Sequence, residues 1–191
     1  MKASIMAAMA TLLEILLLPL AEACTTLAAG RKATADGSVL LSHSDDGEAF
    51  GDPRLCFITA ADHAAGSTRP IYFDTEDYPR FVGSDRGPCY QPHDGQRPSE
   101  PIGYIEEVPH TFAYYESTYG AMNEHGVGIG ESTCSGMFGT NATGYGGKAL
   151  FSVDSLTRIA LERTKSSREA VKLMGDLAEK YGFYGAGSFE G

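Results

Sequence analysis

The spacing of apolar residues changes once along this chain, and this change constrains the fold more than any other feature. Up to residue 133, apolar and β-branched residues form short runs separated by glycine, proline and aspartate, a pattern typical of strands and turns. From Val153 onward, apolar residues recur every three or four positions, which indicates amphipathic helices. Strands followed by helices predict an α+β layered domain.

A first hairpin is predicted directly after residue 23. Its strands are Thr25 to Ala29 and Val39 to Ser44, and the turn-forming segment Ala35-Asp36-Gly37-Ser38 joins them. Residues 51–109 follow with most of the prolines and only brief apolar runs, so we expect a strand and long irregular loops there.

A second hairpin is predicted between residues 111–118, rich in aromatic residues, and residues 127–133. Its turn is expected at Asn123-Glu124-His125-Gly126, and His125 is interpreted as a turn residue. Gly126, Gly128 and Gly130 alternate without the spacing of a dinucleotide motif, and Gly147-Lys148 lacks the flanking residues of a phosphate loop. No cofactor is therefore expected.

Two amphipathic helices are predicted after Val153. Ser166 and Glu169 form a capping box that starts the second helix, Gly182 lies where it should end, and the junction falls near Lys165. The predicted apolar faces consist of Val153, Leu156, Ile159 and Ala160 in the first helix, and of Ala170, Val171, Met174, Leu177, Ala178 and Tyr181 in the second.

The first 23 residues have the features of a signal peptide. Lys2 precedes an apolar stretch, and the small residues Ala21 and Ala23 lie just before Cys24. Cleavage after Ala23 would leave Cys24 as the first residue of a secreted or lumenal protein. A membrane anchor is disfavoured because Glu14 and Pro19 interrupt the apolar stretch. A lipoprotein processing site is an alternative, which Glu22 disfavours.

The charge excludes two classes of partner. The formal net charge is −10 and no run of lysine and arginine occurs, so nucleic acid and anionic membrane surfaces are not expected partners. Small neutral or zwitterionic substrates are easier to accommodate. In an exported protein, Asn141-Ala142-Thr143 is also a candidate glycosylation site at Asn141.

Four cysteines occur, at positions 24, 56, 89 and 134, without a C-x-x-C pair or histidine spacing that would indicate structural zinc. No metal site is therefore expected. If Cys24 stays reduced, at most one disulfide forms among Cys56, Cys89 and Cys134, and the sequence leaves the pairing open.

A cysteine at a new chain start carries a thiol and an α-amine on one residue. The neutral amine can accept the thiol proton, directly or through a water, as the sulfur attacks a carbonyl. An attached signal peptide would turn this amine into an amide, so cleavage after Ala23 would also activate Cys24.

Three blocks of this sequence resemble the dipeptidase A and secernin family of N-terminal-nucleophile hydrolases. They are CTTLAAGRKATADGSVLLSHSDDG at 24–47, VPHTFAYYESTYGAMNEHGVGIGEST at 108–133, and the helix pair with KYGFYGAGSFEG at 180–191. The resemblance implies a four-layer αββα sandwich, of which residues 24–191 are the N-terminal part and the C-terminal part is missing. It also implies that the cysteine hydrolyses short peptides, dipeptides above all.

The resemblance assigns roles to particular residues. Cys24 matches the nucleophile, and Asp46 matches the acid that positions its amine; without the resemblance, Asp45 and Asp46 are an exposed turn. His43 stands where many relatives have an arginine, so this chain has a weaker, titratable cation there.

The segment Glu131-Ser132-Thr133 is the candidate for substrate and oxyanion contacts. By the resemblance, a backbone N–H near Ser132 or Thr133 would face the oxyanion, and Glu131 would hold the free ammonium of a dipeptide. Asn123 is either a turn residue or a substrate contact. The alternatives to a dipeptidase are an N-acyl amide hydrolase of the bile-salt or penicillin-V-acylase type, and an exported scaffold protein without activity.

Overall fold

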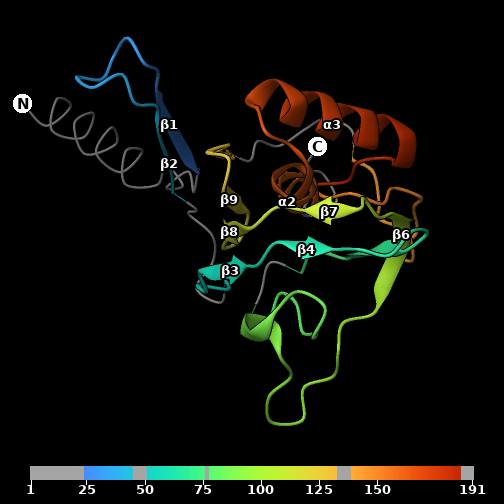
Figure 1. Cartoon of the computed structure of the whole chain (residues 1–191). Coiled ribbons are helices and arrows are strands. Elements are labelled where there is room, and N and C mark those ends of the chain that lie inside the picture. Colours follow the sequence, from blue (N-terminus) through green and yellow to red (C-terminus); the bar gives the residue numbers. More distant parts are fainter. Residues whose placement is uncertain (1–23, 45–50, 76–77, 133–138, 186–191) are drawn as a thin grey trace, which may run out of the picture.

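The structure is a computed structural model, which describes residues 24–44, 51–75, 78–132 and 139–185. Figure 1 shows two helices packed over a set of small antiparallel sheets, with one hairpin projecting to the side. The strands are β1 (Thr25–Ala29), β2 (Leu40–Ser44), β3 (Cys56–Ile58), β4 (Ala61–Asp62), β5 (Thr68–Tyr72), β6 (Pro101–Glu106), β7 (His110–Thr111), β8 (Tyr114–Glu116) and β9 (Gly120–Asn123). This arrangement confirms the α+β class; the four-layer sandwich stays an implication of the resemblance.

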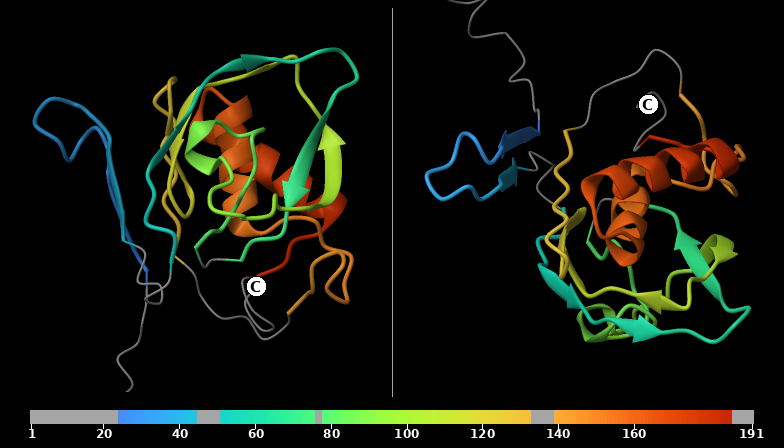
Figure 2. Two further views of the ribbon diagram at one scale, coloured as in Figure 1. Left: turned by 90° about the horizontal axis from the view of Figure 1, so that it is seen from below. Right: turned by 45° about the horizontal axis from the view of Figure 1, so that its top comes forward.

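The strands pair as β1 with β2, β4 with β7, and β5 with β6, while β3, β8 and β9 form a sheet with β8 in the centre. A short 3-10 helix, η1 (Pro88–Tyr90), lies in the loop before β6. The views in Figure 2 show the β1–β2 hairpin standing apart from the main body.

The first hairpin is confirmed as the pair β1 and β2. Thr25 pairs with Ser44 and Ala29 with Leu40. In the turn, the backbone N–H of Ser38 donates to the Asp36 carboxylate over 3.0 Å, and Gly37 has a φ of 75° that favours glycine. The turn chemistry of Asp36 and Gly37 therefore lies within the connection between the two strands, as predicted.

The second hairpin differs from the predicted one. The chain turns back at residues 117–119, so that β8 pairs with β9, and then turns again at 123–126 to place residues 127–129 beside β9. The prediction of direct pairing between 111–118 and 127–133 was wrong. Gly120 lets β9 run against the helix above it, because a Cβ there would lie only 3.1 Å from the backbone carbonyl of Thr157.

The two predicted helices are confirmed as α2 (Val153–Arg163) and α3 (Ser167–Tyr181). The Ser166 side chain accepts from the backbone N–H of Glu169, and Gly182 ends α3 with a φ of 79°. Val171 was wrongly placed on the apolar face: it is 68% exposed, because Ala170 and Met174 already fill the contact between the helices. No helix among the described residues is both long and apolar enough to span a bilayer.

The core lies between the helix pair and the sheets. Aliphatic side chains of α2 and α3 pack against Ile71 of β5 and Ile105 of β6, and a second cluster joins Tyr114 of β8 to Leu161 of α2. A disulfide between Cys56 and Cys89 connects β3 to η1 and decides the pairing that the sequence left open. The helix layer thus holds together strands that come from distant parts of the sequence.

Candidate functional site

Cys24 and His43 come together at the open end of the β1–β2 hairpin. Cys24 directly precedes β1, and the register places Thr26 opposite His43. Thr26 and His43 are partly buried on the side that faces the body, whereas Thr25 and Ser44 are exposed. Alternation along the strands therefore directs the imidazole of His43 inward.

Glu131 reaches the same place because the chain after β9 passes close to the hairpin. A Cβ on Gly130 would lie 2.7 Å from the Thr26 methyl group, and one on Gly128 would lie 3.2 Å from a Leu41 methyl group. The hydroxyl of Thr26 donates to the backbone carbonyl of Glu131 over 2.6 Å. The alternating glycines, which match no nucleotide-binding motif, thus let two backbones approach closely.

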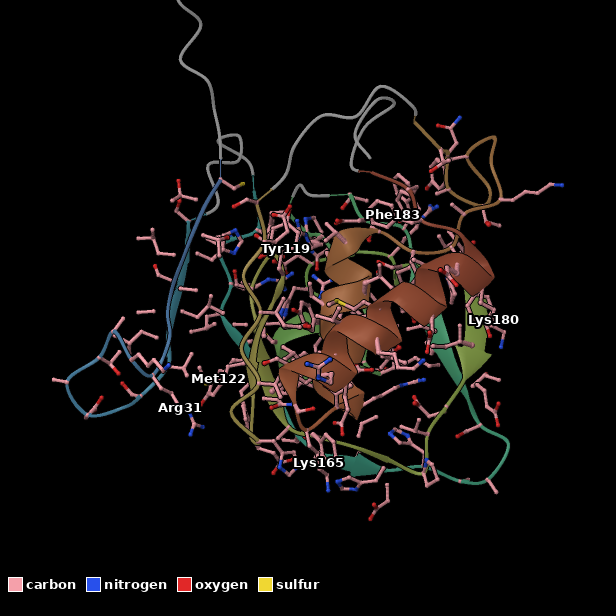
Figure 3. The ribbon with its side chains drawn as sticks, turned by 90° about the horizontal axis from the view of Figure 1, so that it is seen from above. Arg31, Tyr119, Met122, Lys165, Lys180 and Phe183 are labelled. Carbon is pink, nitrogen blue, oxygen red and sulfur yellow. A yellow bond between two sulfur atoms is a disulfide. The ribbon has the colours of Figure 1, made fainter. Side chains whose placement is uncertain are left out.

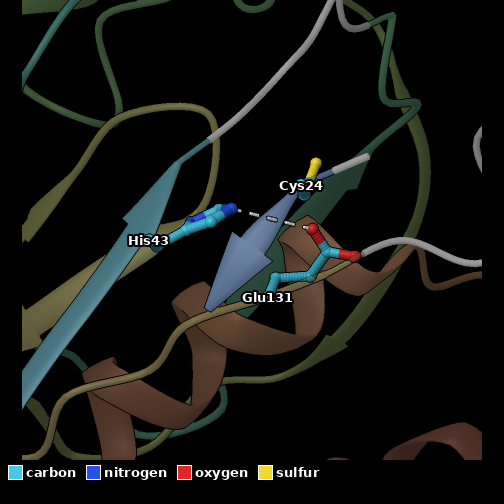
Figure 4. Close-up of side chains that lie close together, drawn as sticks. All are labelled: Cys24, His43 and Glu131. Carbon is cyan, nitrogen blue, oxygen red and sulfur yellow. Dashed lines mark ion pairs between the residues drawn. The ribbon is translucent and has the colours of Figure 1, made fainter. Parts of the chain in front are cut away.

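The three side chains lie close together, as Figure 4 shows. One donor atom each from Cys24, His43 and Glu131 lies within 4.8 Å of the others, and Nε2 of His43 is 4.0 Å from a carboxylate oxygen of Glu131. The side chain of Glu131 is 8% exposed and that of His43 is 19% exposed. A thiol, an imidazole and a carboxylate therefore share one partly enclosed place.

Tyr119 supports His43 from the body. The two rings lie 5.4 Å apart, and Figure 3 shows Tyr119 on the side of the body that faces the hairpin. The guanidinium of Arg80 lies 5.8 Å from the centre of the Tyr119 ring, and Arg80 also pairs with Asp74 over 3.3 Å. Tyr119 and Arg80 connect the site to charges buried beneath it, and the sequence analysis assigned neither residue a role.

Four arginines and four acids form ion pairs on the inner side of α2, and all of them except Arg69 are buried. Glu116 pairs with Arg86 and, over 3.0 Å, with Arg158, and it accepts a hydrogen bond from the Tyr90 hydroxyl at 2.5 Å. The remaining pairs are Arg158 with Asp154, Arg69 with Glu162 and Arg80 with Asp74. The one signal in the sequence was the spacing of Asp154, Arg158 and Glu162 along α2, which equally describes an exposed helix face.

The fold shifts the pKa values of these acids in different directions. Burial alone would raise the pKa of Glu116, but Arg86 and Arg158 outweigh burial and hold that pKa below its usual value. Burial and the charge of Asp154 instead raise the pKa of Asp74 to about 7, against the opposing effect of Arg80. Glu116 is therefore stable as a carboxylate, whereas Asp74 titrates near neutral pH.

The other residues proposed from the sequence lie in different surroundings. Asp46 and Thr133 fall outside the described residues, as do Cys134 and residues 1–23, which the sequence predicts to be a signal peptide. Ser132 is exposed and its hydroxyl donates to Thr26 over 3.0 Å, next to the cluster. Asn141 is exposed in a loop.

Asn123 serves the turn and the helix. Its side-chain amide donates to the carbonyls of Leu161 and Thr164 at 2.9 and 2.8 Å, and its carbonyl accepts from the N–H groups of His125 and Val127. It is 4% exposed, and the positive φ of the turn belongs to Gly126. These hydrogen bonds connect the end of α2 to the turn, so the Asn123 side chain stabilises the fold.

Comparisons with known proteins agree with the resemblance seen in the sequence. The model of peptidase family C69 matches residues 100–190. A probable dipeptidase of Salmonella dublin is 25% identical over 164 residues, which cover 84% of this chain and 33% of that protein. A probable dipeptidase of Latilactobacillus sakei is 26% identical over 169 residues, which cover 84% of this chain and 30% of that protein.

The chain thus spans about a third of the length of these curated relatives. Among solved structures, none matches it significantly. The predicted resemblance to the dipeptidase family is confirmed.

Proposed function

We propose that this chain, which is similar to two probable dipeptidases and matches the model of peptidase family C69 over residues 100–190, carries the nucleophile of an exported cysteine dipeptidase. The observation that carries the proposal is the convergence of Cys24, His43 and Glu131 within 4.8 Å, at the start of the first strand. Residues 1–23 would be removed, so that the α-amine of Cys24 becomes available as the base.

The chemistry then proceeds in two halves. The sulfur of Cys24 bonds to the peptide carbonyl carbon while its proton passes to the α-amine. The tetrahedral intermediate collapses, the C–N bond breaks, and the proton goes to the departing amino acid. A water attacks the thioester in the same way, which releases the first amino acid and restores the thiol. N–H groups near Ser132 would stabilise the oxyanion.

Glu131 supports a substrate with a free ammonium group. Its carboxylate is nearly buried beside the thiol, and buried carboxylates are stabilised by a cationic partner. Its neighbour His43 would then share this carboxylate with the substrate. A dipeptide supplies both the ammonium and, one residue along, the bond to be cut.

Replacing Cys24 tests the proposal. We expect Cys24→Ala to lower dipeptide turnover by about a thousandfold or more, because no other group takes over the attack. The circular dichroism spectrum and the unfolding midpoint should stay unchanged, and Ser42→Ala, an exposed substitution on the same hairpin, should keep full activity. Unchanged turnover of Cys24→Ala would reject a cysteine peptidase. Intact mass of the active protein should show a chain that begins at Cys24.

A comparison of substrates distinguishes the dipeptidase from the alternative activity, hydrolysis of N-acyl amides. An N-acyl amide has no ammonium for Glu131 to bind, and a charge-assisted contact contributes about 1.5 to 3 kcal/mol. We therefore expect kcat/KM for an unblocked dipeptide to exceed that of its N-acetyl form by about tenfold or more. Equal or inverted preference would favour the acyl-amide hydrolase.

A further inference from the structure

Cys24, His43 and Glu131 also have the composition of a metal site. They come from three separate segments: the residue before β1, strand β2 and the segment after β9. Each offers one ligand atom, and all three atoms lie within 4.8 Å of one another. Figure 4 shows the three side chains close together, with Cys24 beside the ion pair of His43 and Glu131. The sequence spacing gave no sign of this grouping, because the three residues are far apart along the chain.

The donor set identifies the class of cation. A thiolate, an imidazole and a carboxylate together suit zinc, whereas magnesium and calcium prefer oxygen ligands. Such ligands lie about 2.0 to 2.3 Å from zinc and hence about 3.3 to 3.6 Å from one another. The ligand atoms lie up to 4.8 Å apart, so they need to approach one another by up to about 1.2 to 1.5 Å to bind the ion.

Neighbouring residues already hold two of the ligands in place. The backbone of Glu131 is fixed by the hydroxyl of Thr26 at 2.6 Å, and the ring of His43 packs on Tyr119. Nε2 of His43 is buried and makes no hydrogen bond within the described part of the chain. Outer contacts of this kind orient the ligands of metal sites.

We propose that Cys24, His43 and Glu131 bind Zn²⁺, and that the bound ion inhibits the peptidase. Binding releases the thiol proton and engages the sulfur lone pair that would attack the substrate. In a chain that starts at Cys24, the α-amine and the sulfur can chelate the ion together and supply a fourth ligand. Inhibition rests on the proposed function, whereas binding does not.

The absorption spectrum of bound Co²⁺ tests metal binding without any measurement of dipeptide turnover. The protein as secreted by an exporting host is titrated with Co²⁺, and a thiolate-to-cobalt charge-transfer band should saturate at one equivalent and vanish on addition of Zn²⁺. Cys24→Ser should abolish the band. His43→Gln and Glu131→Gln should each weaken Zn²⁺ binding, measured by calorimetry, by about tenfold or more.

Two control variants isolate the site. His110→Gln removes an exposed histidine that pairs with Asp62 over 2.7 Å and has no cysteine ligand beside it. This variant should bind Zn²⁺ as the wild type does. Cys134→Ser should keep the cobalt band. A wild-type chain without the band, or a Cys24→Ser chain with unchanged Zn²⁺ affinity, would overturn the proposal.

Activity separates this inference from the proposed function. One equivalent of Zn²⁺ should stop dipeptide hydrolysis, and EDTA should restore it. Tight binding by a chain that hydrolyses no dipeptide would reject the dipeptidase and keep the metal site. Full hydrolysis at saturating Zn²⁺ would reject inhibition through Cys24.

Discussion

At the scale of single residues, the buried charges beneath α2 are the least ordinary feature of this protein. Glu116 is fully buried, and its cost of desolvation is offset only because Arg86, Arg158 and the Tyr90 hydroxyl surround it. Removing one member of such a pair usually costs about 3 to 5 kcal/mol, since the other charge is left buried alone. These residues therefore hold the sheets and α2 in one arrangement.

Asp74 makes stability depend on pH in the neutral range. Its pKa is about 7 in the folded protein, above the ordinary value of 3.8, so the folded state binds the proton more tightly than the unfolded state. The free energy of unfolding from this group is highest below about pH 4 and falls as the pH rises through about 7. Glu116 and Glu162 act in the opposite direction: their pKa values are lowered, and their contribution is lost below about pH 4.5.

Asp74→Asn should remove the fall in the free energy of unfolding that accompanies rising pH. Asparagine resembles the protonated acid, so we expect the variant to match the wild type most closely near pH 4 and to be more stable than the wild type near pH 8. Urea unfolding at both pH values measures this. The exposed acid Asp62, replaced by asparagine, should keep the wild-type pH profile. If the free energy of unfolding of Asp74→Asn fell with pH as in the wild type, the pKa assigned to Asp74 would be wrong.

At the scale of elements, the close approach of the β1–β2 hairpin to residues 128–131 assembles the site. The approach requires glycine at 130, where a Cβ would meet the Thr26 methyl group at 2.7 Å, and Thr26 is itself hydrogen-bonded to Glu131. A methyl group at position 130 therefore pushes Cys24 and His43 away from Glu131, even though none of these three residues is changed.

Gly130→Ala tests this dependence. We expect a destabilisation of about 1 to 3 kcal/mol from overpacking, with a larger relative loss of kcat/KM, because the hairpin moves away from Glu131. Gly30→Ala is the matched control on the same hairpin, since a Cβ there meets nothing within 4 Å. Thr26→Ser deletes the clashing methyl group and keeps the hydroxyl, so it should restore activity to Gly130→Ala. Loss of activity in the double variant would contradict this account.

At the scale of the whole molecule, two groups of apolar side chains are exposed among the described residues. Phe57, Tyr115 and Met122 lie in register across β3, β8 and β9, on the face away from α2, and each is about half exposed. Leu27 and Leu40 are exposed on the hairpin. Contiguous apolar rows of this kind are typical of surfaces that pack against another layer, as the four-layer sandwich implied by the resemblance would require.

Much of the fold and part of the site could be predicted from local patterns. The helix period, the Ser166 capping box, the Gly182 stop and the Asp36-Gly37 turn act within a few residues, so their outcome does not depend on the rest of the chain. Cys24 could be singled out for the same reason, because the predicted cleavage site lies directly before it.

The sequence by itself therefore determined the helices, the first hairpin and the residue that we propose as nucleophile. Only the tertiary structure decided the rest: the pairing of β8 with β9, the Cys56–Cys89 disulfide, the buried pairs of Glu116 and the meeting of Glu131 with Cys24 and His43. These contacts join residues far apart in the chain, and their energies depend on burial and mutual distance. Neither quantity exists until α2 covers the sheets and Gly130 lets the hairpin approach.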